Sequence, residues 1–183
     1  MTRYFLHLFA CILLLTNPSL LKAQEMDAKT QARLQADANK VAEDRRKELM
    51  KDSDYSGTSG KFRIDYEVEM LRIETLMNLK IDEGHQTTTV TVIAITDATK
   101  DYDKMLNKYY QILLKKLQPK DQEILKQAQR NWITYKEAEL KLNLLITDDK
   151  YTGGSLERIY SNSRVMNITK HRLEEIYGYL ERL

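Results

Sequence analysis

The sequence has very little cysteine, proline or glycine. Its 183 residues include one Cys, two Pro and six Gly. A single cysteine excludes a disulfide-stapled scaffold and any cysteine-rich zinc module. So little glycine and proline exclude collagen-like chains and Gly/Ser-rich low-complexity chains. The length that remains suits one domain with its own hydrophobic core.

Charge of neither sign is in large excess. The chain carries 29 Lys+Arg and 27 Asp+Glu, for a formal net charge of +2. A nucleic-acid-binding protein of this composition would need its basic residues concentrated in one patch. Within residues 101–183, the more basic part of the chain, the only such cluster is Lys115, Lys116 and Lys120. We therefore expect no nucleic-acid partner.

The longest apolar run lies at the N-terminus. Arg3 precedes the apolar residues 5–15, Pro18 follows them, and Ala23 offers a small residue before a cleavage point. This is the layout of a secretory signal peptide, and the run is too short to span a bilayer comfortably. We expect residues 1–23 to be removed and the mature protein to be periplasmic or secreted, with no transmembrane segment.

Cys11 lies inside this apolar run. The residues before it vaguely resemble a lipobox, but the apolar residues 12–15 follow it, where a lipidated cysteine leads into a polar tether. We therefore expect Cys11 to leave with the signal peptide. Loss of Arg3 and Lys22 then leaves 27 basic and 27 acidic residues and no cysteine. In an oxidising compartment without a disulfide, the core alone must hold the fold.

Residues 24–60 are predicted to be a helical tether followed by a flexible linker. Residues 26–51 are rich in Ala, Gln, Glu, Lys and Arg, which predicts a helix. Residues 52–60 are polar and contain Gly and Ser, which is typical of a linker. The helix is expected to dock weakly or to stay mobile, because it has only a thin apolar stripe, made by Leu34, Ala38, Val41, Leu49 and Met50.

Residues 61–183 are predicted to form the folded domain. Residues 62–82 begin with strand-like alternation, but their length and their Glu, Leu and Met content favour a helix that ends at Gly84 and His85. Residues 155–183 have an apolar stripe at helical spacing, which includes Leu156 and Tyr160 and is expected to face the bundle. Residues 121–146 have another apolar stripe, which consists of Ile124, Leu125, Ala128, Trp132, Tyr135, Leu142 and Leu145. The pattern predicts an all-α fold, an antiparallel bundle of about four helices.

Residues 87–96 allow two interpretations. Their β-branched run, TTTVTVIAIT, favours a strand by propensity. Residues 97–117, which follow directly, have the spacing of a helix. No glycine or proline separates the two segments. Either a strand runs into a helix, or one long helix starts near Thr88.

The residues that carry most enzyme chemistry are scarce. After signal-peptide removal the chain would have two histidines, His85 and His171, and a metal site would also need at least two carboxylates. His171 is expected on a helix surface. There is no nucleophile elbow, phosphate loop or zinc-protease motif. The carboxylates alternate with Lys and Arg at helical spacing, which is typical of solvated faces. We expect that the protein is not an enzyme and that it binds no metal and no cofactor.

A set of residues in fixed order and spacing carries a family resemblance: Asp103, Leu106-Asn107, Tyr110, Gln129, Trp132-Ile133, Tyr135-Lys136, Gly153-Gly154-Ser155, Thr169 and Arg172. Over about residues 65–183 the chain resembles the LprI family of lysozyme inhibitors. The resemblance implies an exported all-helical domain, mainly helical over residues 87–117. It also implies a lysozyme-type partner that is inhibited by non-covalent occlusion. The alternative is an envelope interaction or structural module with no effect on lysozyme.

The chain departs from the family at one point. Many members carry a cysteine shortly after the Trp-Ile-x-Tyr segment, where this sequence has Glu139-Leu140-Lys141. Leu140 could replace a disulfide bridge with apolar packing.

The matching residues are expected to have structural roles. Trp132 and Tyr135 are predicted to pack in the core. Gly153 and Gly154 are predicted to supply a left-handed turn. Polar members are predicted to bond between helices. These are Asn107, Gln129 and Arg172, and the structural set also holds Asp103, Tyr110, Lys136 and Thr169.

The functional alternative places the loop Asp148–Ser155 at a partner surface. In this interpretation Lys150 and Tyr151 enter the carboxylate-lined cleft of a lysozyme and are buried there as anchors, next to Gly153 and Gly154.

Overall fold

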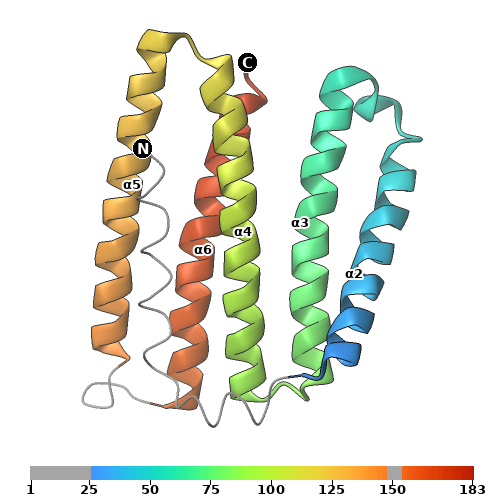
Figure 1. The fold of residues 1–183 in the computed structure, drawn as a ribbon, viewed down its shortest axis with the longest axis vertical. Coiled ribbons are helices and arrows are strands. Elements are labelled where there is room, and N and C mark those ends of the chain that lie inside the picture. Colours follow the sequence, from blue (N-terminus) through green and yellow to red (C-terminus); the bar gives the residue numbers. More distant parts are fainter. Residues whose placement is uncertain (1–25, 148–153) are drawn as a thin grey trace.

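The computed structural model describes residues 26–147 and 154–183, and this part of the chain is almost entirely helical. The predicted all-α fold is therefore confirmed. The predicted signal peptide and the candidate residues Lys150, Tyr151 and Gly153 lie outside the described residues. In chain order the elements are α2 (Ala28–Leu49), the short 3-10 helix η2 (Ser53–Tyr55), α3 (Gly57–Glu83), α4 (Thr88–Lys116), α5 (Pro119–Ile146) and α6 (Ser155–Leu180) (Figure 1).

Helix α4 resolves the ambiguity at residues 87–96 in favour of one long helix. The hydroxyl of Thr96 donates to the carbonyl of Val92 at 2.8 Å, and that of Thr99 to the carbonyl of Ile95 at 2.7 Å. These bonds satisfy the hydroxyls inside the helix. Burial of one face overrides the β-propensity of the run. That face carries Val90, Ala94, Ile95, Ala98, Tyr102, Met105 and Tyr109.

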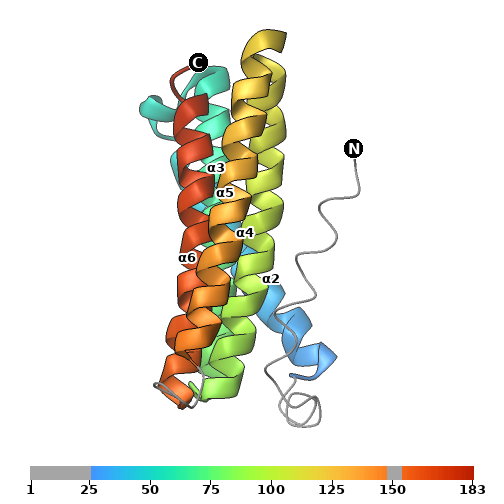
Figure 2. The same ribbon diagram turned by 90° about the vertical axis from the view of Figure 1, so that its left-hand side faces the viewer.

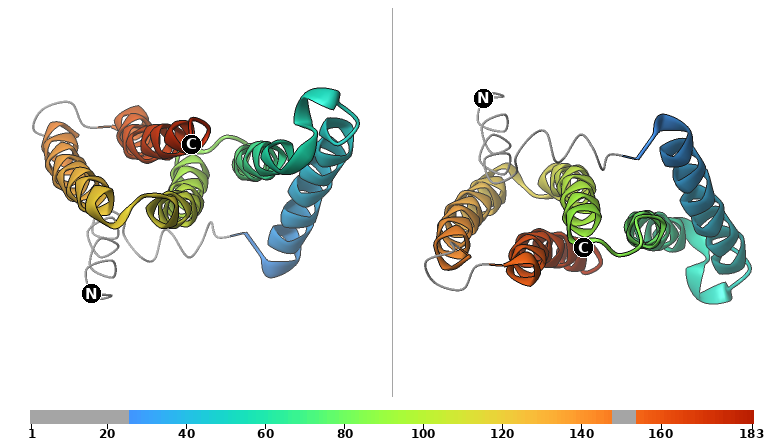
Figure 3. Two further views of the ribbon diagram at one scale, coloured as in Figure 1. Left: turned by 90° about the horizontal axis from the view of Figure 1, so that it is seen from above. Right: turned by 90° about the horizontal axis from the view of Figure 1, so that it is seen from below.

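The helices form an elongated row with α2 at one edge and α5 at the other. Helices α4 and α6 lie between α3 and α5 (Figure 3). Consecutive helices run in opposite directions, as predicted, so α4 and α6 run in the same direction (Figures 1 and 2). These two helices form the most extensive helix pair in the described part of the chain. Helix α5 is the connection that carries the chain back between them.

The main core lies where α3, α4 and α6 meet. The rings of Tyr66 and Tyr177 stack with centroids 3.6 Å apart, and Tyr109 meets the Tyr177 ring edge-on at 5.7 Å. Such geometries add to the stability gained from burying the rings. Helix α5 adds little to this core. Leu125 is the only apolar residue of α5 that is buried. The core residues from the other three helices include Ile73, Tyr102, Met105, Leu106, Tyr109, Leu173, Ile176 and Leu180.

Helix α2 packs along α3 over its whole length, so the prediction of weak docking is wrong. It buries Leu34, Ala38, Ala42 and Leu49. Two of these are alanines, which let the helix backbones approach closely without needing a wide apolar stripe. Arg46 adds an ion pair with Asp65 of α3 at 2.6 Å. The predicted contacts of Val41 and Met50 are not found, because both side chains are exposed.

The linker between α2 and α3 is shorter than the predicted segment 52–60. The 3-10 helix η2 takes up part of it, and α3 already begins at Gly57, so the predicted boundary after Gly60 falls inside a helix. The hydroxyl of Tyr55 donates to Glu67 at 2.7 Å. Gly60 is buried against Tyr55, where a Cβ atom would lie 1.8 Å from the Tyr55 carbonyl oxygen. The turn therefore folds back onto α3 because residue 60 has no side chain.

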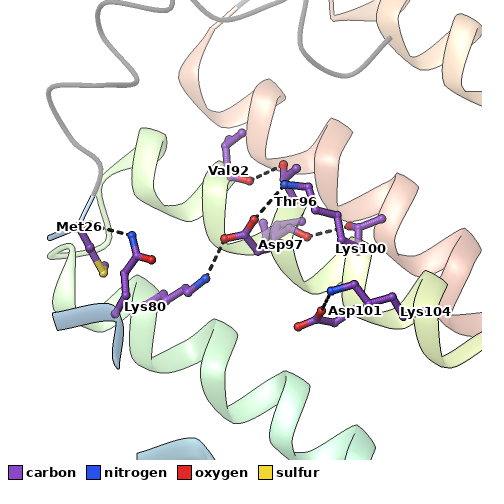
Figure 4. Close-up of polar contacts among 11 residues, drawn as sticks. Met26, Lys80, Val92, Thr96, Asp97, Lys100, Asp101 and Lys104 are labelled. Carbon is purple, nitrogen blue, oxygen red and sulfur yellow. Dashed lines mark hydrogen bonds and ion pairs between the residues drawn. The ribbon is translucent and has the colours of Figure 1, made fainter. Parts of the chain in front are cut away.

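An acidic side chain joins α3 to α4 (Figure 4). Asp97 accepts hydrogen bonds from Lys80 of α3 at 2.7 Å and from Lys100 at 3.1 Å. Burial by itself raises the pKa of Asp97, but the hydrogen bonds and charges of the two lysines outweigh it and hold that pKa below its ordinary value.

Candidate functional site

Most of the family-pattern residues meet where α5 faces α4 and α6. Within this region they form two polar groups, one around Asp103 and one around Arg172. Helix α4 supplies Asp103, Asn107 and Tyr110, helix α5 supplies Gln129, Trp132 and Lys136, and helix α6 supplies Thr169 and Arg172.

The first group links α4 to α5. The Lys136 ammonium lies 3.5 Å from a carboxylate oxygen of Asp103 and 5.0 Å from the centroid of the Trp132 ring. Burial lowers the pKa of Lys136, and the Asp103 charge opposes that shift. The Asn107 amide donates to the backbone carbonyl of Asp103 at 2.9 Å. The predicted inter-helix bond of Asn107 is wrong, because this bond lies within α4.

The second group links α5 to α6. Arg172 donates through Nε to the side-chain oxygen of Gln129 at 3.0 Å and through Nη1 to Glu175 at 2.9 Å. Burial raises the pKa of Tyr110, while the positive charge of Arg172 acts in the opposite direction. Thr169 is fully buried and donates to the carbonyl of Val165 at 3.2 Å. Gln129 and Arg172 thus each bond between helices, as predicted, and the structure identifies them as each other's partners.

Tyr135 lies outside both groups. Its side chain is exposed, so the prediction that it packs in the core is wrong. The reason is that α5 turns a different face toward the bundle. The buried positions of that face are Leu125, Gln129 and Lys136, two of which are polar, and the half-buried Trp132 lies between them.

A groove of about 470 Å³ lies where α5 ends and α6 begins. The Asn143 amide ties its two sides together by donating to the hydroxyl of Ser161 at 2.6 Å. His171 lines the groove and is exposed on the helix surface, as predicted. Leu156 and Tyr160, beside it, are each more than half exposed. The groove could not be predicted from the sequence, because Leu156 and Tyr160 fit the apolar stripe of residues 155–183 and were expected to face the bundle, whereas both are exposed.

Gly154 begins α6 at the edge of this groove. Its φ is +135°, in the region that favours glycine, and a Cβ atom there would meet nothing within 4 Å. Gly154, the one described member of the Gly153–Gly154 pair, thus has the positive φ for which a glycine was predicted here.

The described part of the chain brings no three potential metal ligands together. None of its helices is both long and apolar enough to cross a membrane. The groove contains Glu157 and His171 among polar and aromatic side chains. This arrangement suits binding through hydrogen bonds and aromatic contacts.

The Asp103–Lys136 pair gives a testable prediction. Asp103→Asn removes the charge that faces the buried Lys136 ammonium, so we expect the free energy of unfolding to fall by about 1–3 kcal/mol. The double variant D103N/K136M removes the stranded cation as well and should recover at least half of that loss. Urea unfolding at neutral pH measures both effects.

The pH dependence of the same variants provides a second readout. Because burial lowers the pKa of Lys136, the folded protein binds fewer protons than the unfolded chain at pH values between that pKa and the ordinary 10.5. Stability of D103N should therefore rise with pH in this interval. The double variant should lack that rise. Equal losses in the single and double variants at every pH would contradict the role of the charge pair.

Neither a curated protein sequence nor a solved structure matches the chain. The family model described as "Lysozyme inhibitor LprI" matches residues 82–176, which is just over half of the chain. The match covers the end of α3, all of α4 and α5 and most of α6, including both polar groups. The chain belongs to the LprI lysozyme inhibitor family.

Proposed function

We propose that the protein is an exported inhibitor that binds a lysozyme without a covalent bond and blocks access to its glycan-binding cleft. The observation that carries this proposal is the family match over residues 82–176. The signal-peptide layout of residues 1–23 supports export, since it would deliver the chain to the compartment where lysozymes act.

The enzyme-binding surface that we propose is the end of the bundle where α5 stops and α6 starts. Tyr160 and Leu156 are exposed there beside the groove. Exposed aromatic side chains that become buried in a partner pocket supply much of the energy of protein interfaces. The segment between the two helices contains Lys150 and Tyr151, which we propose as additional anchors, with Gly153 and Gly154 shaping the turn that presents them.

The net charge of the mature chain predicts how fast it would associate with a lysozyme and how strongly salt would affect the association. With 27 basic and 27 acidic residues, the chain would attract a basic enzyme only weakly from a distance. We therefore expect ordinary association rates with a weak dependence on salt, and an affinity that depends on short-range contacts.

Inhibition assays against c-, g- and i-type lysozymes test the proposal. We expect the wild-type protein to inhibit at least one type. The double variant L156A/Y160A should bind that enzyme about 10–100-fold more weakly, because two exposed anchors are lost. Tyr179→Ala is the matched control, since Tyr179 is also exposed on α6 but at the opposite end of the helix.

Two results would overturn parts of this proposal. Absence of both inhibition and complex formation at micromolar concentration for all three types would remove the inhibitor function. Full inhibition by L156A/Y160A, together with a loss in Y179A, would move the binding surface to the other end of the bundle.

A further inference from the structure

Helices α2 and α3 form a hairpin with a hydrophobic core of its own. Two clusters of buried apolar residues join α2 to α3, and neither includes a residue of α4, α5 or α6. Helix α3 contacts α2 more extensively than it contacts α4. The hairpin lies at one edge of the row of helices (Figure 3), and the family match begins only at residue 82, where the hairpin ends. The α2–α3 hairpin is therefore a separable unit, which continues into α4 through residues 84–87.

Residues 84–87, which we call the hinge, have a strained backbone. His85 and Gln86 have φ values of +53° and +57°, and no other non-glycine residue in the described part of the chain has a positive φ. In this conformation the Cβ atom of an ordinary residue comes too close to the following carbonyl oxygen. Helices that end in this way usually have a glycine at the left-handed position, but here Gly84 comes one residue earlier, with φ −83°. The side chains of His85 and Gln86 are exposed, so their burial does not offset the strain.

Gly84 shows a second constraint on the hinge. A Cβ atom at residue 84 would lie 2.4 Å from Cγ1 of Val90 on α4. Val90 is buried and β-branched, so its side chain has little freedom to rotate away. In a continuous helix, residues six positions apart lie on different faces and about 9 Å apart along the axis. The turn therefore requires a residue without a side chain at position 84, whereas a straight helix does not.

Straightening the hinge would release both constraints. Residues 57–116 contain no proline, so α3 and α4 can continue into each other as one helix of about 90 Å. Thr87 caps α4 without a side-chain hydrogen bond, so no such bond is lost. The cost lies elsewhere. A straight hinge carries the hairpin away from α4 and α6 and breaks the contacts that α3 makes with them.

A second copy of the chain can restore those contacts. An opened hairpin uncovers the face of α4 and α6 on which α3 lies, including Tyr177, against which Tyr66 of α3 stacks. If two copies open, the α3 of each can lie on α4 and α6 of the other in the register seen within one chain. The ion pair between Lys108 of α4 and Glu69 of α3 then forms between chains. Only the hinge changes its conformation, which is why exchange of identical segments is a low-cost route to dimers.

We propose that the chain forms a domain-swapped dimer, in which two copies exchange their α2–α3 hairpins and each hinge becomes helical. The occupant of the uncovered α4–α6 face is the hairpin of the second copy, because it matches that face residue for residue. Short turns under strain favour such exchange. Association also costs the free motion of two chains, so the dimer is expected at high protein concentration. Helix α5 and the groove take no part in the exchange, and the proposal is independent of the inhibitor function.

Refolding from urea at low and at high protein concentration tests the proposal, with protein that lacks residues 1–23. Exchange requires the hairpin to leave the core, so monomer and dimer should interconvert slowly and separate by size-exclusion chromatography. The wild type is expected to refold to monomer at low micromolar concentration. A fraction of dimer should appear as the concentration approaches the millimolar range. Both forms should have the same helix content by circular dichroism.

Gly84→Ala is expected to raise the dimer fraction at least fivefold at a given concentration. The added Cβ atom conflicts with Val90 in the turn, and alanine favours the straight helix of the dimer. Chromatography after refolding measures the change, and circular dichroism checks that the variant is folded.

The double variant H85G/Q86G is expected to have the opposite effect. Glycine adopts positive φ without a steric penalty and weakens a continuous helix, so the dimer fraction should fall at least fivefold. The matched control is S53G/D54G, in the turn between α2 and α3. Ser53 and Asp54 are exposed as well, but neither has a positive φ. Their turn stays inside the hairpin in both forms, so the control should keep the wild-type dimer fraction.

A cross-link between two variants identifies the exchange itself. The Lys108 ammonium lies 2.5 Å from the Glu69 carboxylate, across the contact between α4 and α3. Without residues 1–23 the chain has no other cysteine, so E69C and K108C each carry one. Refolded together at high concentration, they should be joined to each other by a short bis-maleimide. Either variant refolded alone should not, because its two cysteines would lie in opposite halves of the dimer.

Three results would overturn the proposal. The first is that the wild type and G84A both stay monomeric at every concentration. The second is that H85G/Q86G and S53G/D54G give equal dimer fractions, which would show that the strain in the hinge has no effect. The third is a dimer without the cross-link between E69C and K108C, because the two copies would then be joined through another surface. If G84A does not fold, the comparison of the two glycine variants and the cross-link still decide the question.

Discussion

Gly60→Ala is expected to lower the free energy of unfolding by about 3 kcal/mol. An added Cβ atom would lie 1.8 Å from the carbonyl oxygen and 2.0 Å from the carbonyl carbon of Tyr55. Both are backbone atoms and cannot rotate away as the end of a side chain could. The turn before α3 must therefore shift, and the Tyr55–Glu67 hydrogen bond and the packing of Tyr55 near α2 are lost with it.

Gly178→Ala is the control for this variant. Gly178 is also inside a helix, but a Cβ atom there meets nothing within 4 Å. Alanine has the higher helix propensity, so this variant should gain up to about 1 kcal/mol. Urea unfolding followed by circular dichroism measures both effects. Similar stability changes in G60A and G178A would show that the close approach to Tyr55 does not matter.

Alkaline pH is expected to unfold the protein steeply. Burial raises the pKa of Tyr102 and Tyr109 far above the ordinary value of 10.0, and nearby acidic side chains raise it further. Above pH 10 the unfolded chain loses these protons while the folded protein keeps them. The unfolded state then binds fewer protons, so stability falls as pH rises. Each tyrosine contributes about 1.4 kcal/mol per pH unit, or nearly 3 kcal/mol for the two together.

This loss is large compared with the total stability of a typical domain, about 5–15 kcal/mol. We therefore expect cooperative unfolding between about pH 11 and 13, with tyrosine ionisation and loss of helix in one transition. Absorbance of tyrosinate and circular dichroism measure the two signals. Ionisation of all tyrosines near pH 10 without loss of helix would contradict the prediction.

Tyr109→Phe provides the matched variant for the alkaline experiment. The Tyr109 hydroxyl is buried and has no hydrogen-bond partner in the described part of the chain. Its removal should therefore leave stability at neutral pH unchanged or raise it by about 1 kcal/mol. The same change removes one ionisable group, so the slope above pH 10 should decrease by about 1.4 kcal/mol per pH unit.

The helices themselves could be predicted from the sequence, because helix propensity and length are local properties. Gly84 marks the end of α3 as predicted. The segment before α4 could not be settled, because β-branched residues favour a strand until burial against other helices is known. The docking of α2 was also missed, because two of its buried residues, Ala38 and Ala42, carry almost no hydrophobic signal.

The orientation of α5 shows why the candidate site was harder to predict than the fold. An apolar stripe normally faces the core, but α5 turns Gln129 and Lys136 inward and leaves most of its stripe, including Leu142, exposed. The inward residues are held by partners on other helices, Arg172 and Asp103. Such pairs depend on the tertiary arrangement and leave no periodic trace in the sequence. The family pattern indicated these residues, although not their partners.

Because α4 and α6 run in the same direction, the length of α5 sets where α6 begins relative to α4. A helix of 28 residues is about 42 Å long, and it sets how far the chain travels back before α6 begins. Inserting one residue in α5 would displace the start of α6 along α4 by about 1.5 Å and rotate it by about 100°. Relatives that lengthen α5 should therefore lengthen α4 and α6 by matching numbers of turns, so that helix lengths in this family vary together.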